Sequence, residues 1–181
     1  MHRSVEIALN EVGYVEKATN EQLDEKLANA GSGNFTKYAR DLDRLPVFYN
    51  GQKQGCPWCD VFVDWCFVQA YGWRRAERML CQPPFGRGAG CRYSMGYFRR
   101  HGRLEKAPHP GDQIFFQVDG QVCHTGLVTA VDGQYVYTVE GNTSQDEGVI
   151  ANGGCVRAKR YALNSPVIAG FGRPRYEEEP E

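Results

Sequence analysis

The order of hydrophobic patterns along the chain predicts an α+β fold, with helices first and an antiparallel sheet after them. Up to about residue 101, apolar residues recur at helical spacing, whereas short apolar runs separated by turn signals follow Gly102. The chain has 181 residues, of which 41% are hydrophobic and 24% charged. This composition supports one folded core and excludes a disordered or fibrous protein.

Two amphipathic helices are predicted near the N-terminus. Apolar side chains fall at i, i+3, i+4 and i+7 across residues 5–12, and this pattern ends at Gly13. The same spacing appears across residues 35–42, ahead of Pro46. The polar segment between the two patterns is predicted to be a loop.

A different helix is predicted over residues 58–71, whose sequence is WCDVFVDWCFVQAY. It is apolar on nearly all sides, which indicates a buried helix. Pro57 stands where proline favours a helix start, and Gly72 stands where glycine ends one. A weaker helical pattern covers residues 90–101.

Five short strands are predicted after the turn Pro110-Gly111-Asp112. The dipeptides Asp132-Gly133 and Asn152-Gly153 stand at positions expected for hairpin turns. The strands are residues 114–116, 124–131, 135–140, 155–162 and 167–172. We expect one domain over residues 1–174, with the helices packed on the sheet, and an acidic tail over residues 175–181.

The charge distribution argues against two classes of partner. The formal net charge is −1, and four of the last five residues are glutamates. This gives no support for nucleic acid as a partner, which needs a concentrated basic surface. No apolar run reaches 18 residues, so membrane insertion is not expected. We expect a monomer.

The N-terminal segment carries Glu6 and has no uninterrupted apolar stretch, so it does not resemble a secretory signal peptide. The sequence therefore predicts synthesis in the cytoplasm. There are seven cysteines, and an odd number leaves at least one thiol unpaired in a monomer. In a reducing compartment, most of them should be free thiols.

Cys59 is a candidate nucleophile because it falls in the first turn of the predicted buried helix. The positive end of the helix dipole and unpaired N–H groups favour the thiolate, which is the reactive form of cysteine. The alternative is a small buried apolar residue, which is the commonest fate of a free cysteine.

His124 is a candidate base, since it opens a strand and is followed by small residues. A hairpin at Asp132-Gly133 places the end of the next strand, with Glu140 and Asn142, across from it. Either side chain would orient an imidazole as the third member of a nucleophile–base–orienter set. The alternatives are a structural histidine, a solvated glutamate and a turn asparagine.

Four segments in order resemble motifs of the CHAP-type cysteine amidohydrolases and endopeptidases, which belong with the NlpC/P60 peptidoglycan hydrolases in a papain-like group. WCDVFV, from Trp58, resembles the family's WCxxFV motif. The three segments PGDQIFF, HTGLVTAV and VEGNTS resemble its PGDIVFF, HVGIVT and IEGN segments.

The resemblance implies a papain-like fold, with Cys59 as nucleophile, His124 as base, Glu140 as orienter and Asn142 assisting. It implies no cofactor and a peptidoglycan substrate in the bacterial cell wall, cleaved either between muramic acid and L-alanine or within the stem or crossbridge peptide. No carboxylate lies between Asp43 and Asp60, so the calcium site of some members is not carried over, and no metal is expected.

A wall hydrolase without a signal peptide suggests a phage lysin or a protein delivered by a phage tail or secretion machine. Two other functions compete with this interpretation. The Cys56-x-x-Cys59 spacing is compatible with a redox or metal-binding pair, but no βαβ unit precedes it and no second pair follows. A wall-binding module without activity is also possible in principle, although every proposed catalytic position is filled.

Overall fold

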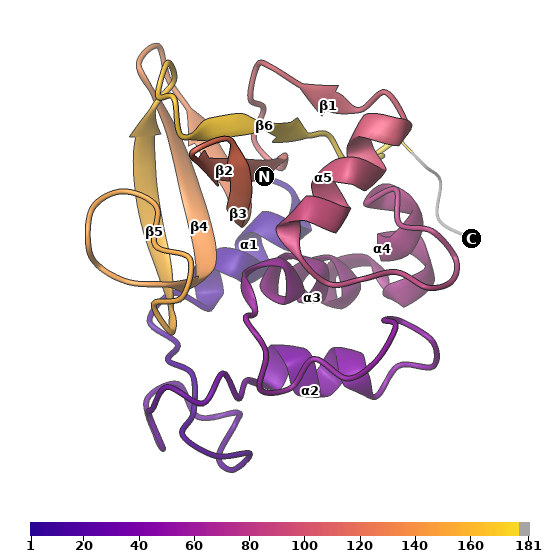
Figure 1. The fold of residues 1–181 in the computed structure, drawn as a ribbon, viewed down its shortest axis with the longest axis vertical. Coiled ribbons are helices and arrows are strands. Elements are labelled where there is room, and N and C mark those ends of the chain that lie inside the picture. Colours follow the sequence, from indigo (N-terminus) through magenta and orange to yellow (C-terminus); the bar gives the residue numbers. More distant parts are fainter. Residues whose placement is uncertain (178–181) are drawn as a thin grey trace.

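Helices fill the first hundred residues and strands follow them, in a computed structural model that describes residues 1–177 (Figure 1). The helices are α1 (Arg3–Asn10), α2 (Lys37–Asp43), α3 (Cys59–Tyr71), α4 (Trp73–Met79) and α5 (Cys91–Arg100). The strands are β1 (Leu104–Glu105), β2 (Gln113–Val118), β3 (Gln121–Val131), β4 (Tyr135–Thr143), β5 (Cys155–Ala162) and β6 (Ile168–Gly172). The predicted α+β fold is confirmed.

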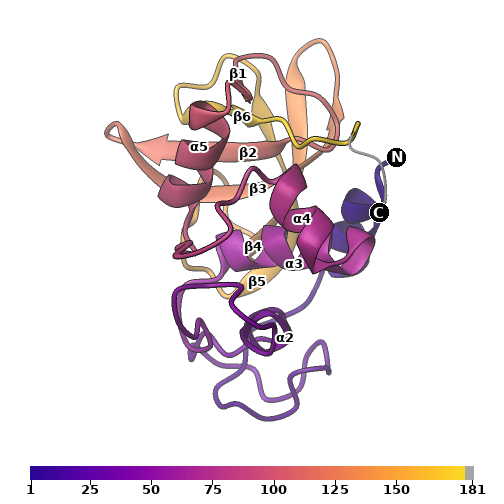
Figure 2. The same ribbon diagram turned by 90° about the vertical axis from the view of Figure 1, so that its right-hand side faces the viewer.

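The strands form one antiparallel sheet in the order β1-β6-β2-β3-β4-β5. In Figures 1 and 2, α1, α3 and α5 lie on one side of this twisted sheet, and α2 lies beyond α3. Between helices and sheet is the larger hydrophobic core, which includes Phe62, Phe67, Phe115 and Leu127. A smaller core on the other face of the sheet is centred on Phe116.

The central element is α3, which packs against α1, α2, α4, β3 and β4. Neighbours on every side explain why its sequence is apolar nearly all round. It ends at Gly72, whose φ of 79° is strained for any residue with a side chain. Because α3 is fixed along its whole length, the position of its first residue is fixed against the sheet.

The predictions for the other elements were partly right. The helices predicted over residues 5–12, 35–42 and 90–101 are present with shifted ends. The sequence patterns predicted neither α4 nor the two-residue strand β1. The prediction was wrong at one turn, the hairpin at Asn152-Gly153, because β4 and β5 are joined by the long connection 144–154. Gly153 instead lies against the backbone of Thr143 and donates its N–H to the carbonyl of Asn142 at 2.9 Å.

The first residues of the predicted acidic tail pack on the body, where the N–H of Arg175 donates to the carbonyl of Met79 at 3.0 Å. The ring of Tyr176 stacks on that of His2 with centroids 3.6 Å apart, and Glu177 pairs with Arg103 at 2.6 Å. The rest of the tail, residues 178–181, lies outside the described residues, and the boundary at residue 174 stays a prediction.

No helix within residues 1–177 has the length and apolar character needed to cross a membrane.

Candidate active site

Cys59 is the first residue of α3, and its side chain is only 6% exposed. The first turn of α3 lies directly against β4 at Gly141, which has no side chain to keep the two elements apart. A Cβ atom at Gly141 would lie 2.6 Å from Phe62 Cβ and 2.8 Å from the ring of Trp58. The structure therefore brings the start of α3 to the part of β4 that carries Glu140 and Asn142.

Trp58, the residue before Cys59, fixes this helix start. Its side chain is fully buried, and its indole N–H donates to Glu16 Oε2 at 2.8 Å. The indole also packs near the ring of Tyr38, with centroids 5.5 Å apart. A large side chain held by both packing and a hydrogen bond gives α3 little freedom to shift along its axis.

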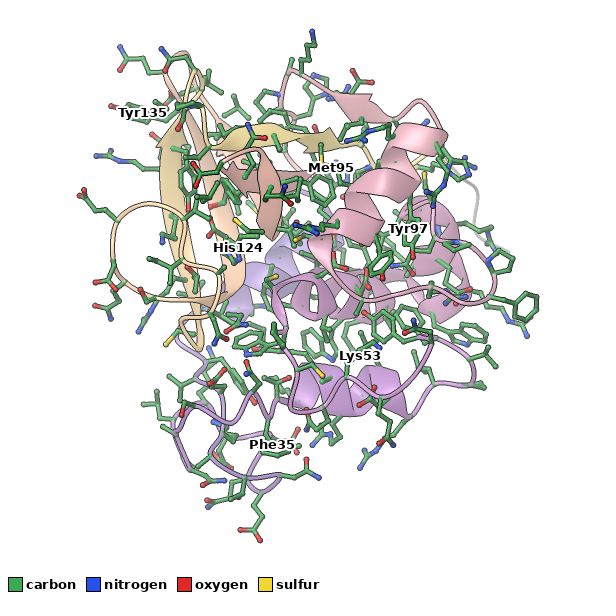
Figure 3. The ribbon with its side chains drawn as sticks, in the orientation of Figure 1. Phe35, Lys53, Met95, Tyr97, His124 and Tyr135 are labelled. Atoms are coloured by element: carbon green, nitrogen blue, oxygen red, sulfur yellow. The ribbon has the colours of Figure 1, made fainter. Side chains whose placement is uncertain are left out.

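His124 and Glu140 form a hydrogen bond across β3 and β4, with 3.0 Å between His124 Nε2 and Glu140 Oε2. Both side chains are fully buried, and the position of His124 in the fold is labelled in Figure 3. The carboxylate accepts two further bonds, from Thr138 Oγ1 at 2.6 Å and from the hydroxyl of Tyr161 at 3.2 Å. The imidazole stacks on the ring of Phe116 with centroids 5.8 Å apart.

These contacts define the tautomer of His124. A carboxylate accepts hydrogen bonds, so the imidazole proton belongs on Nε2, where it is donated to Glu140. Nδ1 then carries a lone pair, and this atom is buried with no hydrogen-bond partner in the part of the chain that the structure describes. A buried acceptor without a partner is rare in folded proteins and is typical of a group that acts on a ligand. The ring is thus set up to accept a proton at Nδ1.

The contact between His124 and Glu140 was expected, but the pairing differs from the predicted one. Leu127 pairs with Val139, and an irregularity between Val128 and Ala130 shifts the strands by one residue. Continuing this pairing places Glu140 opposite Gly126 instead of His124.

Glycine at position 126 lets the carboxylate lean diagonally to the histidine. A Cβ atom there would lie 2.5 Å from Glu140 Cγ. Gly126, two residues after His124 in the sequence, is therefore needed for the contact between His124 and Glu140.

Asn142 does not bond to His124. Its backbone has a φ of 56°, and its Oδ1 accepts the N–H of Gly154 at 3.2 Å. Its backbone carbonyl accepts the N–H of Gly153. These bonds hold the end of the 144–154 connection to β4. Asn142 Nδ2 is buried and has no partner among residues 1–177, so both N–H donors of this amide are left for another group.

The thiol of Cys59 meets the thiol of Cys91, the first residue of α5. This hydrogen bond and burial raise the pKa of Cys59 well above its ordinary value, whereas the bond lowers the pKa of Cys91. The expectation that the helix start alone would favour the Cys59 thiolate is therefore wrong for this closed state, because a buried neighbouring thiol and loss of solvent outweigh the helix dipole.

Cys56 is exposed, whereas Cys59 is buried. Because the thiol of Cys59 bonds to Cys91, the structure gives no support to a functional Cys56–Cys59 pair. All seven cysteines are free thiols. Within residues 1–177, no group of three or more His, Cys, Asp or Glu side chains is arranged to hold a metal ion.

The sequence analysis missed several buried polar residues around this site. No local motif marks them, because their partners come from distant parts of the chain. Asp60 carried the clearest signal, as a charged residue in an otherwise apolar helix. The missed residues are Asp60, Cys91, Gln113, Thr138 and Tyr161.

A comparison with protein families matches residues 51–142 to the CHAP domain. This segment is about half of the chain and contains Cys59, His124, Glu140 and Asn142, so the protein belongs to the CHAP family. Membership implies amidase or peptidase activity on peptidoglycan. No curated protein and no solved structure matches the chain.

Proposed function

We propose that this protein is a cysteine hydrolase that cleaves an amide bond in bacterial peptidoglycan. Cys59 is the nucleophile, His124 the base and Glu140 the group that orients the histidine. The observation that carries this proposal is the buried bond between His124 and Glu140, which leaves Nδ1 of the histidine without a partner. This bond lies next to Gly141 of β4, against which the first turn of α3 packs.

The chemistry follows from these atoms. His124 Nδ1 takes the thiol proton of Cys59, and the sulfur attacks the carbonyl carbon of the amide. N–H groups of the first turn of α3 are oriented to stabilise the oxyanion. The imidazolium then gives its proton to the leaving amine. Water, deprotonated by the histidine, hydrolyses the thioester and restores the thiol.

The buried carboxylate of Glu140 matters most while the histidine is charged. An imidazolium out of contact with solvent is costly unless an anion lies beside it. Glu140 supplies that anion, and Thr138 and Tyr161 hold it in place. The same bond keeps the ring from rotating between the two proton transfers.

Substrate entry requires a local change, because Cys59 is 6% exposed and His124 is fully buried. In this buried arrangement, the sulfur of Cys59 is in contact with the thiol of Cys91. Breaking this contact between the two thiols would free the sulfur and remove the hydrogen bond that raises its pKa. Opening and activation of the nucleophile would then be one event.

Product analysis tests the function and identifies the bond. Purified peptidoglycan sacculi are incubated with the protein or with its Cys59→Ser variant, and released fragments are analysed by mass spectrometry. A new free N-terminus on L-alanine identifies a muramoyl–L-alanine amidase, whereas a new terminus within the stem or crossbridge identifies an endopeptidase. Identical fragment patterns for both proteins would contradict the assignment of Cys59.

The route to the wall is a further part of the proposal. A phage lysin or a protein delivered by a secretion machine is the route that we propose. Lysis of whole cells from outside, compared with digestion of isolated sacculi, tests whether the protein needs such delivery. A redox role for Cys56 and Cys59 has less support, because one thiol is exposed and the other bonds elsewhere.

A further inference from the structure

Asp60, the residue after Cys59, is a carboxylate enclosed in the protein and only 2% exposed. Its Oδ2 accepts the N–H of Gly90 and the hydroxyl of Ser94, each at 2.8 Å. Its Oδ1 accepts Nε2 of Gln113 at 2.9 Å. All three partners are neutral donors, so three hydrogen bonds take the place of an ion pair.

Two of these partners hold the start of α5. Gly90 caps this helix and Ser94 lies in its first turn. Between them is Cys91, whose thiol meets that of Cys59. Asp60 therefore fixes the first turn of α5 against the first turn of α3.

The third partner connects α3 to the strand that carries the base. The same Nε2 of Gln113 lies 3.1 Å from Thr125 Oγ1, and this hydroxyl donates to the carbonyl of Ile114 at 2.7 Å. Thr125 directly follows His124, as Asp60 directly follows Cys59. A chain of buried hydrogen bonds thus joins the neighbours of the two proposed reacting residues.

Burial of the Asp60 carboxylate costs free energy, and packing alone does not explain why a carboxylate stands at this position. Burial raises the pKa of Asp60 against the effect of its three hydrogen bonds. Apolar replacement of a buried polar group together with its partners is often neutral or stabilising. Gln113 Oε1 is also buried without a partner.

We propose that Asp60 and Gln113 are positioning residues that set the separation between Cys59 on α3 and His124 on β3. The proposal rests on the proposed function, in which these two residues react together. Effective reaction needs the attacking sulfur and the base aligned closely, and a misplacement of about 1 Å can lower a rate by about 100-fold.

The same helix offers a matched control. Asp64, one turn after Asp60, is 1% exposed, accepts Nε2 of Gln82 at 2.7 Å and accepts the hydroxyl of Tyr49. Gln82 Oε1 is also buried without a partner. This second carboxylate–amide bond resembles the first, but Gln82 follows α4 and makes no bond to β3.

The test compares Gln113→Leu with Gln82→Leu. Each substitution removes one buried amide donor and leaves one carboxylate with a lost bond, so both should destabilise the protein similarly in urea unfolding. On a soluble muropeptide substrate, Gln113→Leu should lower kcat by about 10-fold to 100-fold with little change in KM. Gln82→Leu should leave kcat within about twofold of the unmodified protein.

A charge-exchanged pair tests the bond itself. In Asp60→Asn with Gln113→Glu, the new amide can accept from Gly90 and Ser94 and donate to the new carboxylate. The double variant should recover at least about 10-fold of the kcat lost in Gln113→Glu alone, in which two carboxylates face each other. This comparison also serves if Gln113→Leu fails to fold.

The proposal is overturned if Gln113→Leu and Gln82→Leu lower kcat equally, or if the double variant is no better than the single ones. Failure of the proposed function gives a different result. If Cys59→Ser keeps activity, the nucleophile is wrong. If Cys59→Ser is inactive while Gln113→Leu keeps full kcat, only the positioning role is wrong.

Discussion

Glu140 Oε2 lies 3.0 Å from His124 Nε2, and neither side chain is exposed to solvent. The carboxylate receives donors from three residues on three strands, namely His124 on β3, Thr138 on β4 and Tyr161 on β5. Because three donors hold this carboxylate in place, it cannot move with the imidazole ring of His124. Water cannot take its place as the acceptor. The carboxylate therefore sets both the tautomer and the direction of the histidine.

Glu140→Gln should lower the hydrolysis rate by about 10²–10⁴-fold, the range for positioned acid–base groups. Glutamine keeps the size of the side chain but removes the charge that stabilises the imidazolium, and its amide group replaces one acceptor oxygen. The rate is measured on sacculi by loss of turbidity, with circular dichroism to confirm folding.

Asn142→Ala is the matched comparison, since Asn142 bonds to Gly154 and not to His124. It should cost clearly less activity than Glu140→Gln. A nearly normal rate for Glu140→Gln together with a collapse for Asn142→Ala would make the amide the orienting group and reverse the assignment.

Cys59→Ser should abolish hydrolysis, whereas Cys56→Ser should keep most of it. Only Cys59 begins α3, and Cys56 is exposed in the loop before it. Activity on sacculi is measured for both variants at equal concentrations of folded protein. Equal losses would indicate that the two thiols act together as a pair.

The sequence could predict most of the fold, because the strongest patterns are local. The apolar run of α3 between Pro57 and Gly72 marks one buried helix and both of its ends. The pattern failed for α4, whose seven residues contain three arginines. It also failed at Asn152-Gly153, because a turn signal shows that the chain bends and does not show how long the connection is.

The site could be predicted only in part, because only some of its residues carry local sequence signals. Cys59 and His124 carry local signals, because Cys59 stands at a helix start and small residues follow His124. His124 does not open its strand as predicted, since β3 begins at Gln121. The diagonal reach of Glu140 depends on an irregularity in strand pairing and on the space above Gly126, which no local pattern reveals. The thiol contact with Cys91 depends on how two helices pack, and it reversed the expected direction of the Cys59 pKa shift.

Cys91→Ala should shift the reactivity of Cys59 to lower pH. The hydrogen bond that the Cys59 thiol donates to Cys91 is the largest cause that raises the pKa of Cys59, so its removal lowers that pKa and thiolate forms at lower pH. The rate of alkylation of Cys59 by iodoacetamide is followed against pH by peptide mass spectrometry.

A Cys123→Ala variant is the control for this measurement, because Cys123 is another free thiol with no hydrogen bond to Cys59. An unchanged alkylation midpoint in Cys91→Ala, or an equal shift in Cys123→Ala, would contradict the role given to the Cys91 thiol.

Removal of divalent metal ions should leave activity and stability unchanged within about twofold. The proposed steps need only Cys59, His124, Glu140 and water. Hydrolysis of sacculi and the thermal midpoint are measured with and without EDTA, followed by dialysis to control for direct effects of the chelator. A loss that calcium or zinc restores would reveal a metal site built from residues far apart in the sequence.

In Asp64→Asn, the free energy of unfolding should fall less than in the unmodified protein as pH rises above about 4. Burial is the main cause that raises the pKa of Asp64 well above its ordinary value, and the nearby Asp60 adds to it. Between the unfolded carboxyl pKa of about 3.9 and this raised pKa, the folded protein keeps a proton that the unfolded chain has released. The free energy of unfolding therefore falls as pH rises through this window.

Asparagine at position 64 cannot titrate, so it removes the Asp64 part of that fall, which is about 1.4 kcal/mol for each unit between the two pKa values. Urea unfolding at several pH values measures the difference between the variant and the unmodified protein. Gln82→Leu is the control with the opposite sign, because it removes a hydrogen bond that lowers the pKa of Asp64 and should extend the decline to higher pH. Parallel stability curves for all three proteins would show that Asp64 has the same pKa in the folded and unfolded chains.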